Sequence, residues 1–155
     1  MNQVMDKLHD SSLYKLYNSF SPASRAAILF AVPFTIVDAI HYFTAGTALI
    51  FSFPILILIY LYCGSVAARI AYPSEQDASN LPRIGRSSAL RLWLTSTVIN
   101  TLLMIILGFA SLGITLLSGV FYLCLFVPFH VLGSALSGWV GGWLYQQYIH
   151  RIGVK

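Results

Sequence analysis

Charged residues are scarce in this 155-residue chain. Only 9% of the residues are Asp, Glu, Lys or Arg, whereas 57% are hydrophobic. Soluble domains usually carry about 25% charged residues, and a soluble fold of this length could not bury so much apolar surface. The composition therefore excludes a soluble globular protein and predicts an all-α polytopic membrane protein.

Motifs for the common catalytic chemistries are missing as well. The chain has no G-x-S-x-G, no H-E-x-x-H and no glycine-rich phosphate loop. Its two cysteines, Cys63 and Cys124, lie in apolar stretches without a C-x-x-C pair, as is typical of buried thiols that act as small hydrophobes. We expect neither an enzyme nor a metal site.

Four apolar segments are long enough to cross a bilayer, which takes about 20 helical residues. The expected spans are about 22–43, 48–71, 88–110 and 119–145. Between them, residues 72–87 hold two prolines and charges of both signs, which predicts a loop joining two helical hairpins. The expected fold is four transmembrane helices in one domain over 21–150, with a short tail over 151–155.

Residues 1–20 follow a different pattern. Their apolar and aromatic side chains fall roughly on one helical face, and most of the charged ones fall elsewhere. This pattern predicts a short amphipathic helix lying in the headgroup region of the membrane. A disordered tail is the alternative.

The positive charges lie on one side of this topology. All nine Lys and Arg residues precede or begin the first span, flank the 72–87 loop or follow the fourth span. The positive-inside rule makes that side cytoplasmic, so we expect both termini in the cytoplasm and the plasma (inner) membrane as the location. The net charge of +4 then reflects topology, not nucleic-acid binding. A patch for lipid headgroups or an acidic partner is a second interpretation of the arginines.

Four polar side chains interrupt the spans, and an ionisable group inside a membrane is a functional candidate by default. They are Asp38, His41, Asn100 and His130. Their estimated depths place Asp38, Asn100 and His130 in about one layer, and His41 lies one turn from Asp38, within its reach. Three interpretations compete. In the first, Asp38 and His41 bond each other while Asn100 and His130 join the third and fourth spans by hydrogen bonds. The second is an ion or proton path with Asp38 as the titrating group and a histidine as its relay, and the third is axial ligation of haem or chlorophyll by His41 and His130. The two histidines differ by about 6–7 Å in expected depth, which disfavours a shared haem.

Small residues recur every fourth position in the last span. They form two offset series, Ser134, Gly138 and Gly142, and Gly133, Ser137 and Gly141. Positions four apart share a helix face, and small side chains there let another membrane helix approach closely. An aromatic belt at the membrane interface accompanies them: Trp139, Trp143, Tyr145 and Tyr148.

The two series of small residues in the last span favour one function over the others. We expect a helix-packing subunit or assembly partner of a larger membrane complex or homo-oligomer, in contact with lipid and with helices of its own or another chain. The alternatives are an oligomeric ion- or proton-coupled transporter or channel that uses Asp38, and a haem- or chlorophyll-binding membrane subunit that uses His41 and His130.

Overall fold

The described part of the chain is almost entirely helical. The computed structural model describes residues 12–43, 49–72, 78–110 and 114–152. The elements are α2 (Ser12–Ser19), α3 (Pro22–Phe43), α4 (Leu49–Ala71), the 3-10 turn η1 (Ala78–Asn80), α5 (Leu81–Ala110) and α6 (Ile114–Ile152). No strand occurs in these ranges, so the all-α fold class is confirmed.

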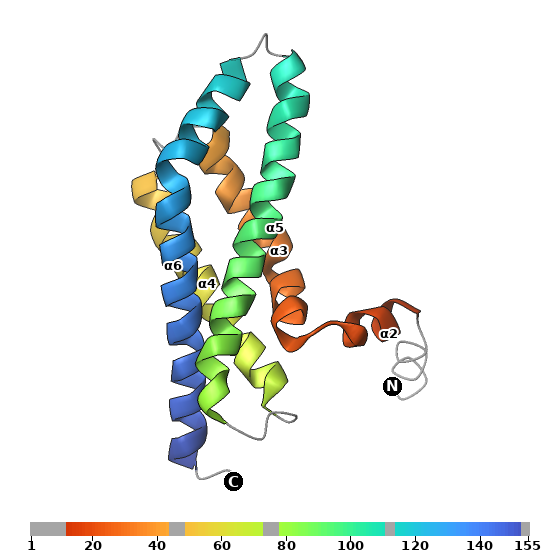
Figure 1. The fold of residues 1–155 in the computed structure, drawn as a ribbon, viewed down its shortest axis with the longest axis vertical. Helices are drawn as coiled ribbons and strands as arrows, with labels where there is room; N and C mark the ends of the chain where they lie inside the picture. The colour runs from red at the N-terminus through yellow and green to blue at the C-terminus, as the bar shows by residue number, and fades with distance from the viewer. Residues whose placement is uncertain (1–11, 44–48, 73–77, 111–113, 153–155) are drawn as a thin grey trace.

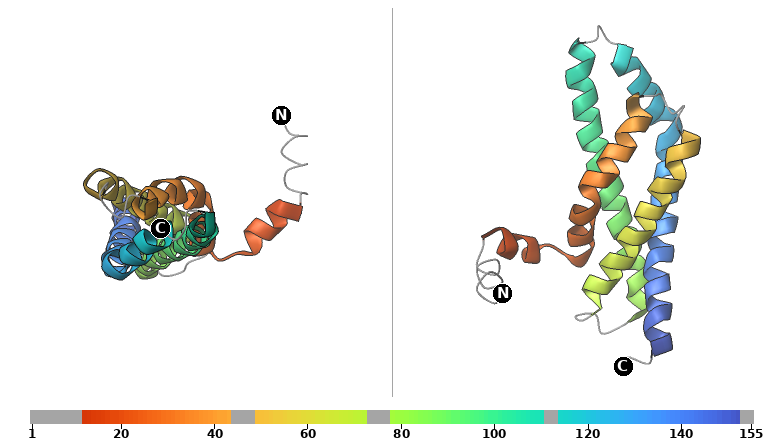
Figure 2. Two further views of the ribbon diagram at one scale, coloured as in Figure 1. Left: turned by 90° about the horizontal axis from the view of Figure 1, so that it is seen from above. Right: turned by 180° about the vertical axis from the view of Figure 1, so that it is seen from behind.

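The long helices α3 to α6 lie side by side and alternate in direction along the bundle, while α2 leads away from it sideways (Figures 1 and 2). Three helical stretches of the described residues are long and apolar enough to cross a membrane: Pro22–Ile40, Ser52–Ala71 and Ala78–Leu107. These are the features of a multi-pass membrane protein. The fourth expected span lies on α6, where most side chains between 114 and 126 are outside the described residues, so it stays a prediction.

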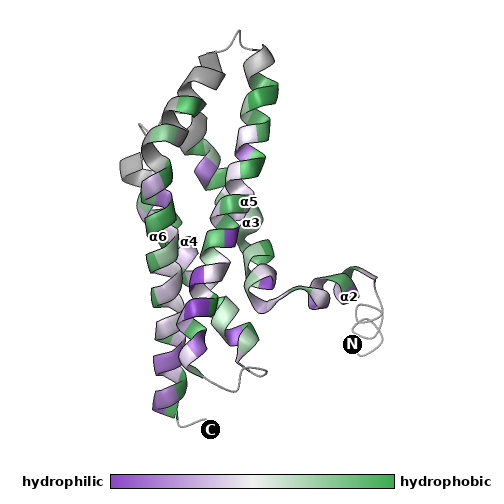
Figure 3. Cartoon of the chain, in the orientation of Figure 1, coloured by the Kyte–Doolittle hydropathy of each residue, from purple (hydrophilic) through white to green (hydrophobic). Residues whose placement is uncertain are grey.

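Polar side chains gather at one end of the bundle. Figure 3 shows hydrophilic residues where α5 begins and α6 ends, and hydrophobic ones on the coloured parts of both helices away from this end. The apolar side chains on the outside of α3 and α5, such as Val32 and Ile106, are 69% and 65% exposed. An outward-facing apolar surface is what contact with lipid requires.

The start of α3 follows its local sequence. Ser21 caps the helix, because the backbone N–H of Ser24 donates to the Ser21 hydroxyl at 3.3 Å. Pro22 occupies the first helical position, where a missing N–H costs nothing. The expected first span, 22–43, matches the bounds of α3.

The expected loop over 72–87 is too long, because α5 already begins at Leu81. Pro82 and Gly85 suggested a loop, yet a proline is tolerated in the first turn of a helix. Leu81 is fully buried against Ala68, Ala71 and Ile149. This tertiary contact, which the local sequence does not reveal, holds the first two turns in helical form.

The small-residue surface of α6 packs against α4 and α5 of the same chain. A Cβ atom added to Gly142 would lie 2.5 Å from the carbonyl oxygen of Leu81, and one added to Gly138 would lie 2.6 Å from that of Gly85. Gly141 meets the α4 backbone at Leu61 in the same way. The close approach predicted for this surface is therefore made within the chain, and these three glycines are buried.

The two offset series differ in how deeply they lie. Ser134 is buried together with the three glycines, whereas Gly133 and Ser137 are half-buried at the edge of the surface. Trp139, Trp143 and Tyr148 point outward and are exposed. Tyr145 packs edge-on against Tyr72 of the chain segment that follows α4, with ring centroids 6.4 Å apart.

Candidate functional site

A buried carboxyl group joins α3 to α5. Asp38, in α3, is only 1% exposed. Its Oδ2 atom accepts a hydrogen bond of 2.7 Å from the Ser96 hydroxyl and one of 3.1 Å from the Asn100 side-chain amide, both in α5. Ser96 and Asn100 are themselves buried. We call these three residues the Asp38 cluster.

The spacing of the donors on α5 explains the geometry. Ser96 and Asn100 are four residues apart and therefore lie on one helix face. The Asn100 amide also donates to the Ser96 hydroxyl at 3.2 Å. Ser96 thus accepts one hydrogen bond while it donates another, and both donors converge on the same carboxylate oxygen. Hydrogen bonds of this kind suit an ionised carboxylate.

Two oxygen atoms near the cluster are left without a hydrogen bond. They are Asn100 Oδ1 and Thr35 Oγ1, both buried and without a partner among the described residues. Thr35 precedes Asp38 by three residues and shares its face of α3. An Asn100 amide turned by half a rotation would present Oδ1 to Asp38 as an acceptor, so the same side chain can serve the ionised and the protonated acid.

His130 lies in a second polar contact, between α6 and α4. Its side chain is 1% exposed, and its Nδ1 atom lies 3.5 Å from the Tyr60 hydroxyl. The Tyr60 ring packs on Phe34 of α3, with centroids 4.8 Å apart. Phe34 is one helical turn before Asp38. Packed side chains thus run from the α3 face that carries Asp38 to the histidine.

The predicted polar residues are therefore divided between two contacts. The structure brings Asp38 and Asn100 together and places His130 on Tyr60. The side chain of His41 lies outside the described residues, so its expected contact with Asp38 and the cofactor alternative that needs it stay predictions. Within the described part of the chain, no group of three or more His, Cys, Asp or Glu residues could hold a metal ion.

Two residues of these polar contacts were not predicted from the sequence: Ser96, which bonds Asp38, and Tyr60, which contacts His130. Ser96 had a signal, since it lies one turn from Asn100 on the same helix face. Tyr60 lies in a long apolar run, and the only feature of it that could have indicated a polar contact is its hydroxyl group, which usually forms a hydrogen bond when buried. Both are fully or almost fully buried polar groups at helix contacts.

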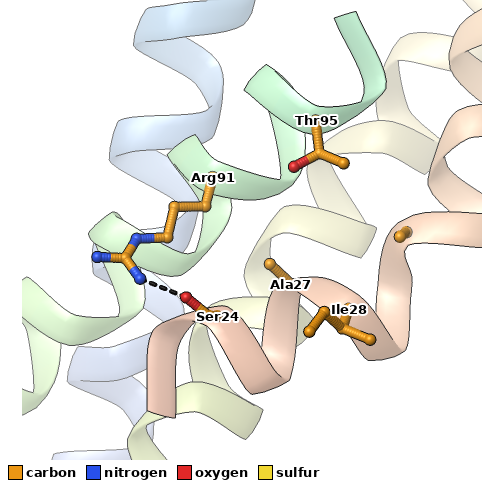
Figure 4. Close-up of a pocket in the computed structure, with 6 residues that line it drawn as sticks. Ser24, Ala27, Ile28, Arg91 and Thr95 are labelled. Carbon is orange, nitrogen blue, oxygen red and sulfur yellow. Dashed lines mark hydrogen bonds between the residues drawn. The ribbon is translucent and has the colours of Figure 1, made fainter. Parts of the chain in front are cut away.

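A groove between α3 and α5 lies on the polar side of the Asp38 cluster. Ser24, Ala27 and Ala31 line it from α3, and Arg91 and Thr95 line it from α5, around a cavity of about 200 Å³. The Arg91 guanidinium donates to the Ser24 hydroxyl, as Figure 4 shows, and to the Ser21 hydroxyl at 2.8 Å. Thr95 is the neighbour of Ser96 in sequence, so the groove ends close to the cluster.

Comparisons with known proteins add no assignment. No protein-family model matches the sequence, and no curated protein or solved structure matches it significantly. Function must therefore be argued from the residues and contacts described above.

Proposed function

We propose that this chain is an integral membrane protein that carries or conducts a proton or a monovalent cation, with Asp38 as the group that takes it up. The observation that supports this proposal most directly is the burial of an ionisable carboxyl group between two apolar helices, where it accepts hydrogen bonds from the neutral side chains of Ser96 and Asn100.

The energetics favour a role beyond joining helices. A charged side chain at the centre of a membrane helix costs roughly 2.5–3.5 kcal/mol on insertion scales, whereas an interhelical hydrogen bond returns about 0.6 kcal/mol on average. Asparagine at position 38 would accept the same hydrogen bonds without a charge. A purely structural cluster therefore gains little from an aspartate, whereas a group that must gain and lose a proton needs one.

The unpaired oxygen atoms point to the same chemistry. Asn100 Oδ1 and Thr35 Oγ1 are buried without a hydrogen bond from the described residues. Carboxylate, amide and hydroxyl oxygens are the ligands that hard cations prefer, and an amide or hydroxyl oxygen can also accept the proton of a neutral carboxyl group. A bound cation or a proton on Asp38 would therefore give these oxygen atoms a partner, and polar atoms without one are costly to bury.

The proposed topology has four spans in two hairpins, with both termini in the cytoplasm and the plasma (inner) membrane as location. The arginines support it, because Arg25 begins α3, Arg69 ends α4, Arg83 begins α5 and Arg151 ends α6. With helices that alternate in direction, these positions share one end of the bundle (Figure 1). Positive charge concentrated on one side marks the cytoplasmic face.

Reconstituted liposomes would test the proposed cargo. We expect the wild-type protein to dissipate a pH gradient, a Na⁺ gradient or a K⁺ gradient faster than empty liposomes, and Asp38→Asn to reduce that flux at least tenfold. Ser65→Ala is the matched control, because it removes an interhelical hydrogen bond, the one from Ser65 to the Gly141 carbonyl oxygen, without touching an ionisable group. Equal flux in wild type and Asp38→Asn, or none in either, would refute the proposal.

A role as a subunit or assembly partner is the second candidate. Its support is the half-buried edge of the α6 surface, where Gly133 and Ser137 lie next to the exposed side chains of Leu132 and Leu136. The glycines at the centre of the surface no longer support it, since α4 and α5 already occupy them. Ser137→Leu should then reduce the native mass in mild detergent, whereas Leu132→Ile should not. An unchanged mass for Ser137→Leu would leave no evidence for assembly through this edge.

A further inference from the structure

Three arginines project from the first turns of α5, at the polar end of the bundle. Arg83, Arg86 and Arg91 are all exposed. Arg83 and Arg91 lie on one helix stripe with Ser87 between them, because successive members are four residues apart. Together with Ser87 the three arginines line a cavity of about 360 Å³ on the outer face of α5.

A second cavity continues from the first toward α3. It measures about 380 Å³ and is lined by Arg83, Ser87 and Arg91 of α5, and by Ser21 and Ala23 around the start of α3. The α3 end that faces it is the amino-terminal one, where the backbone N–H groups and the helix dipole favour an anion. Positive charge therefore surrounds this space from two helices.

These guanidinium groups have no carboxylate partner in the described part of the chain, where Asp38 is the only acidic residue and is buried in the Asp38 cluster. Neighbouring like charges repel one another. Hydroxyl groups supply the described hydrogen bonds, since Arg91 donates to Ser21 and Ser24. An anion with several acceptor oxygens would relieve the repulsion and match the planar guanidinium donors, and a phosphate group has that geometry.

The surroundings of the cavities identify the source of the phosphate. Leu90 and Leu94 line the outer cavity beside the arginines, and Leu94 is 56% exposed on the apolar face of α5. At the same end of the bundle, α2 leaves sideways and exposes Leu13 and Leu16 (Figure 2). Basic and apolar side chains thus meet where the headgroups and the first acyl carbons of a bilayer would lie.

We propose that Arg83, Arg86 and Arg91 bind the phosphate group of an anionic phospholipid in the cytoplasmic leaflet. The phosphate lies among the three guanidinium groups and the Ser87 hydroxyl, next to the start of α3, and an acyl chain follows Leu90 and Leu94 along α5. This site is separate from the Asp38 cluster and does not depend on the proposed transport function.

Native mass spectrometry of the full chain in a neutral detergent would test the site with phosphatidylglycerol as the probe. We expect Arg83→Gln/Arg86→Gln to weaken binding of this lipid about tenfold or more, since a hydrogen bond to a charged group is worth about that factor. Lys15→Gln/Arg151→Gln is the matched control, because it removes the same charge from exposed positions that line neither cavity. We expect less than a twofold change for it.

Two further arms distinguish the sources of the phosphate. Phosphatidylcholine should bind at least fivefold more weakly than phosphatidylglycerol, and millimolar inorganic phosphate should not displace the lipid. Equal losses in both double variants, equal binding of the two lipids, or displacement by inorganic phosphate would each overturn the proposal. The first two outcomes would indicate non-specific attraction, and the third a site for a soluble phosphate.

Discussion

Gly138 of α6 and Gly85 of α5 meet without room for a side chain between them. A Cβ atom on Gly138 would lie 2.6 Å from the Gly85 carbonyl oxygen and 2.5 Å from the Cβ atom of Ala89. The first of these is a backbone atom, so it could move only if the whole helix moved. Contact between backbones, which replaces hydrophobic burial as the driving force for helix association in lipid, is therefore concentrated at this crossing.

Gly138→Ala should destabilise the protein. Overpacking costs typically about 1–3 kcal/mol, and the rigid neighbours place this site at the upper end, although alanine returns up to about 1 kcal/mol of helix propensity. Gly133→Ala is the matched control on the same helix, because its Cβ would meet only Phe53 at an ordinary 3.7 Å. Thermal unfolding in detergent should rank Gly133→Ala at or above wild type and Gly138→Ala clearly below it. The reverse ranking would contradict the packing.

Ser65→Ala should have a small effect. The Ser65 hydroxyl donates to the Gly141 carbonyl oxygen at 2.9 Å. That carbonyl lies inside α6 and keeps its helical hydrogen bond, so the substitution leaves no buried acceptor unpaired. We expect a loss of about 0.5–1 kcal/mol of unfolding free energy, measured by the same thermal unfolding. A loss as large as that of Gly138→Ala would mean that this hydrogen bond, not backbone contact, holds α4 against α6.

Much of the bundle could be predicted from sequence, because its signals are local. Long apolar runs and the Ser21-Pro22 start specify α3 without reference to the rest of the chain. The small-residue series on α6 predicted a close helix contact, but the series alone could not identify the partner helix. The same glycines would serve a second copy as well as they serve α4 and α5.

The start of α5 and the partners of the polar residues depend on tertiary structure. The first turns of α5 contain a proline, a glycine and arginines, which are local signals for a loop, yet burial of Leu81 overrides them. Asn100 was predicted near Asp38 from an estimate of depth. Ser96 and Tyr60 were not, because a hydroxyl group in an apolar run becomes informative only when the facing helix is known.

The proposed topology makes a labelling prediction. In a chain with Cys63→Ala and Cys124→Ala, a cysteine at Ser79, which is exposed just before α5, should react with a membrane-impermeant maleimide only after the membrane is opened. A cysteine at Gly113, in the expected outer turn, should react in intact cells. Reaction of the Ser79 position from outside would show that the orientation is the reverse of the proposed one, with the arginines outside the cytoplasm, against the positive-inside rule.

Asp38 and Ser96 should be energetically coupled across the α3–α5 contact. Their hydrogen bond is 2.7 Å long and fully buried, and residues in one hydrogen-bond network show interaction energies of roughly 0.5–3 kcal/mol in double-mutant cycles. The cycle combines Asp38→Asn with Ser96→Ala and measures unfolding free energy in detergent. Ser96→Ala alone should destabilise the protein, because the carboxylate loses its shorter donor. In the Asp38→Asn background the same change should matter less, since asparagine carries no charge that needs stabilising.

The control cycle pairs Asp38→Asn with Ser65→Ala, which lies at the α4–α6 contact and belongs to neither helix of the Asp38 cluster. Its coupling should lie within about 0.5 kcal/mol of zero, as for sites without shared partners. If Asp38 and Ser96 coupled no more strongly than this control pair, the hydrogen bond would contribute little and Asp38 would be held by other contacts.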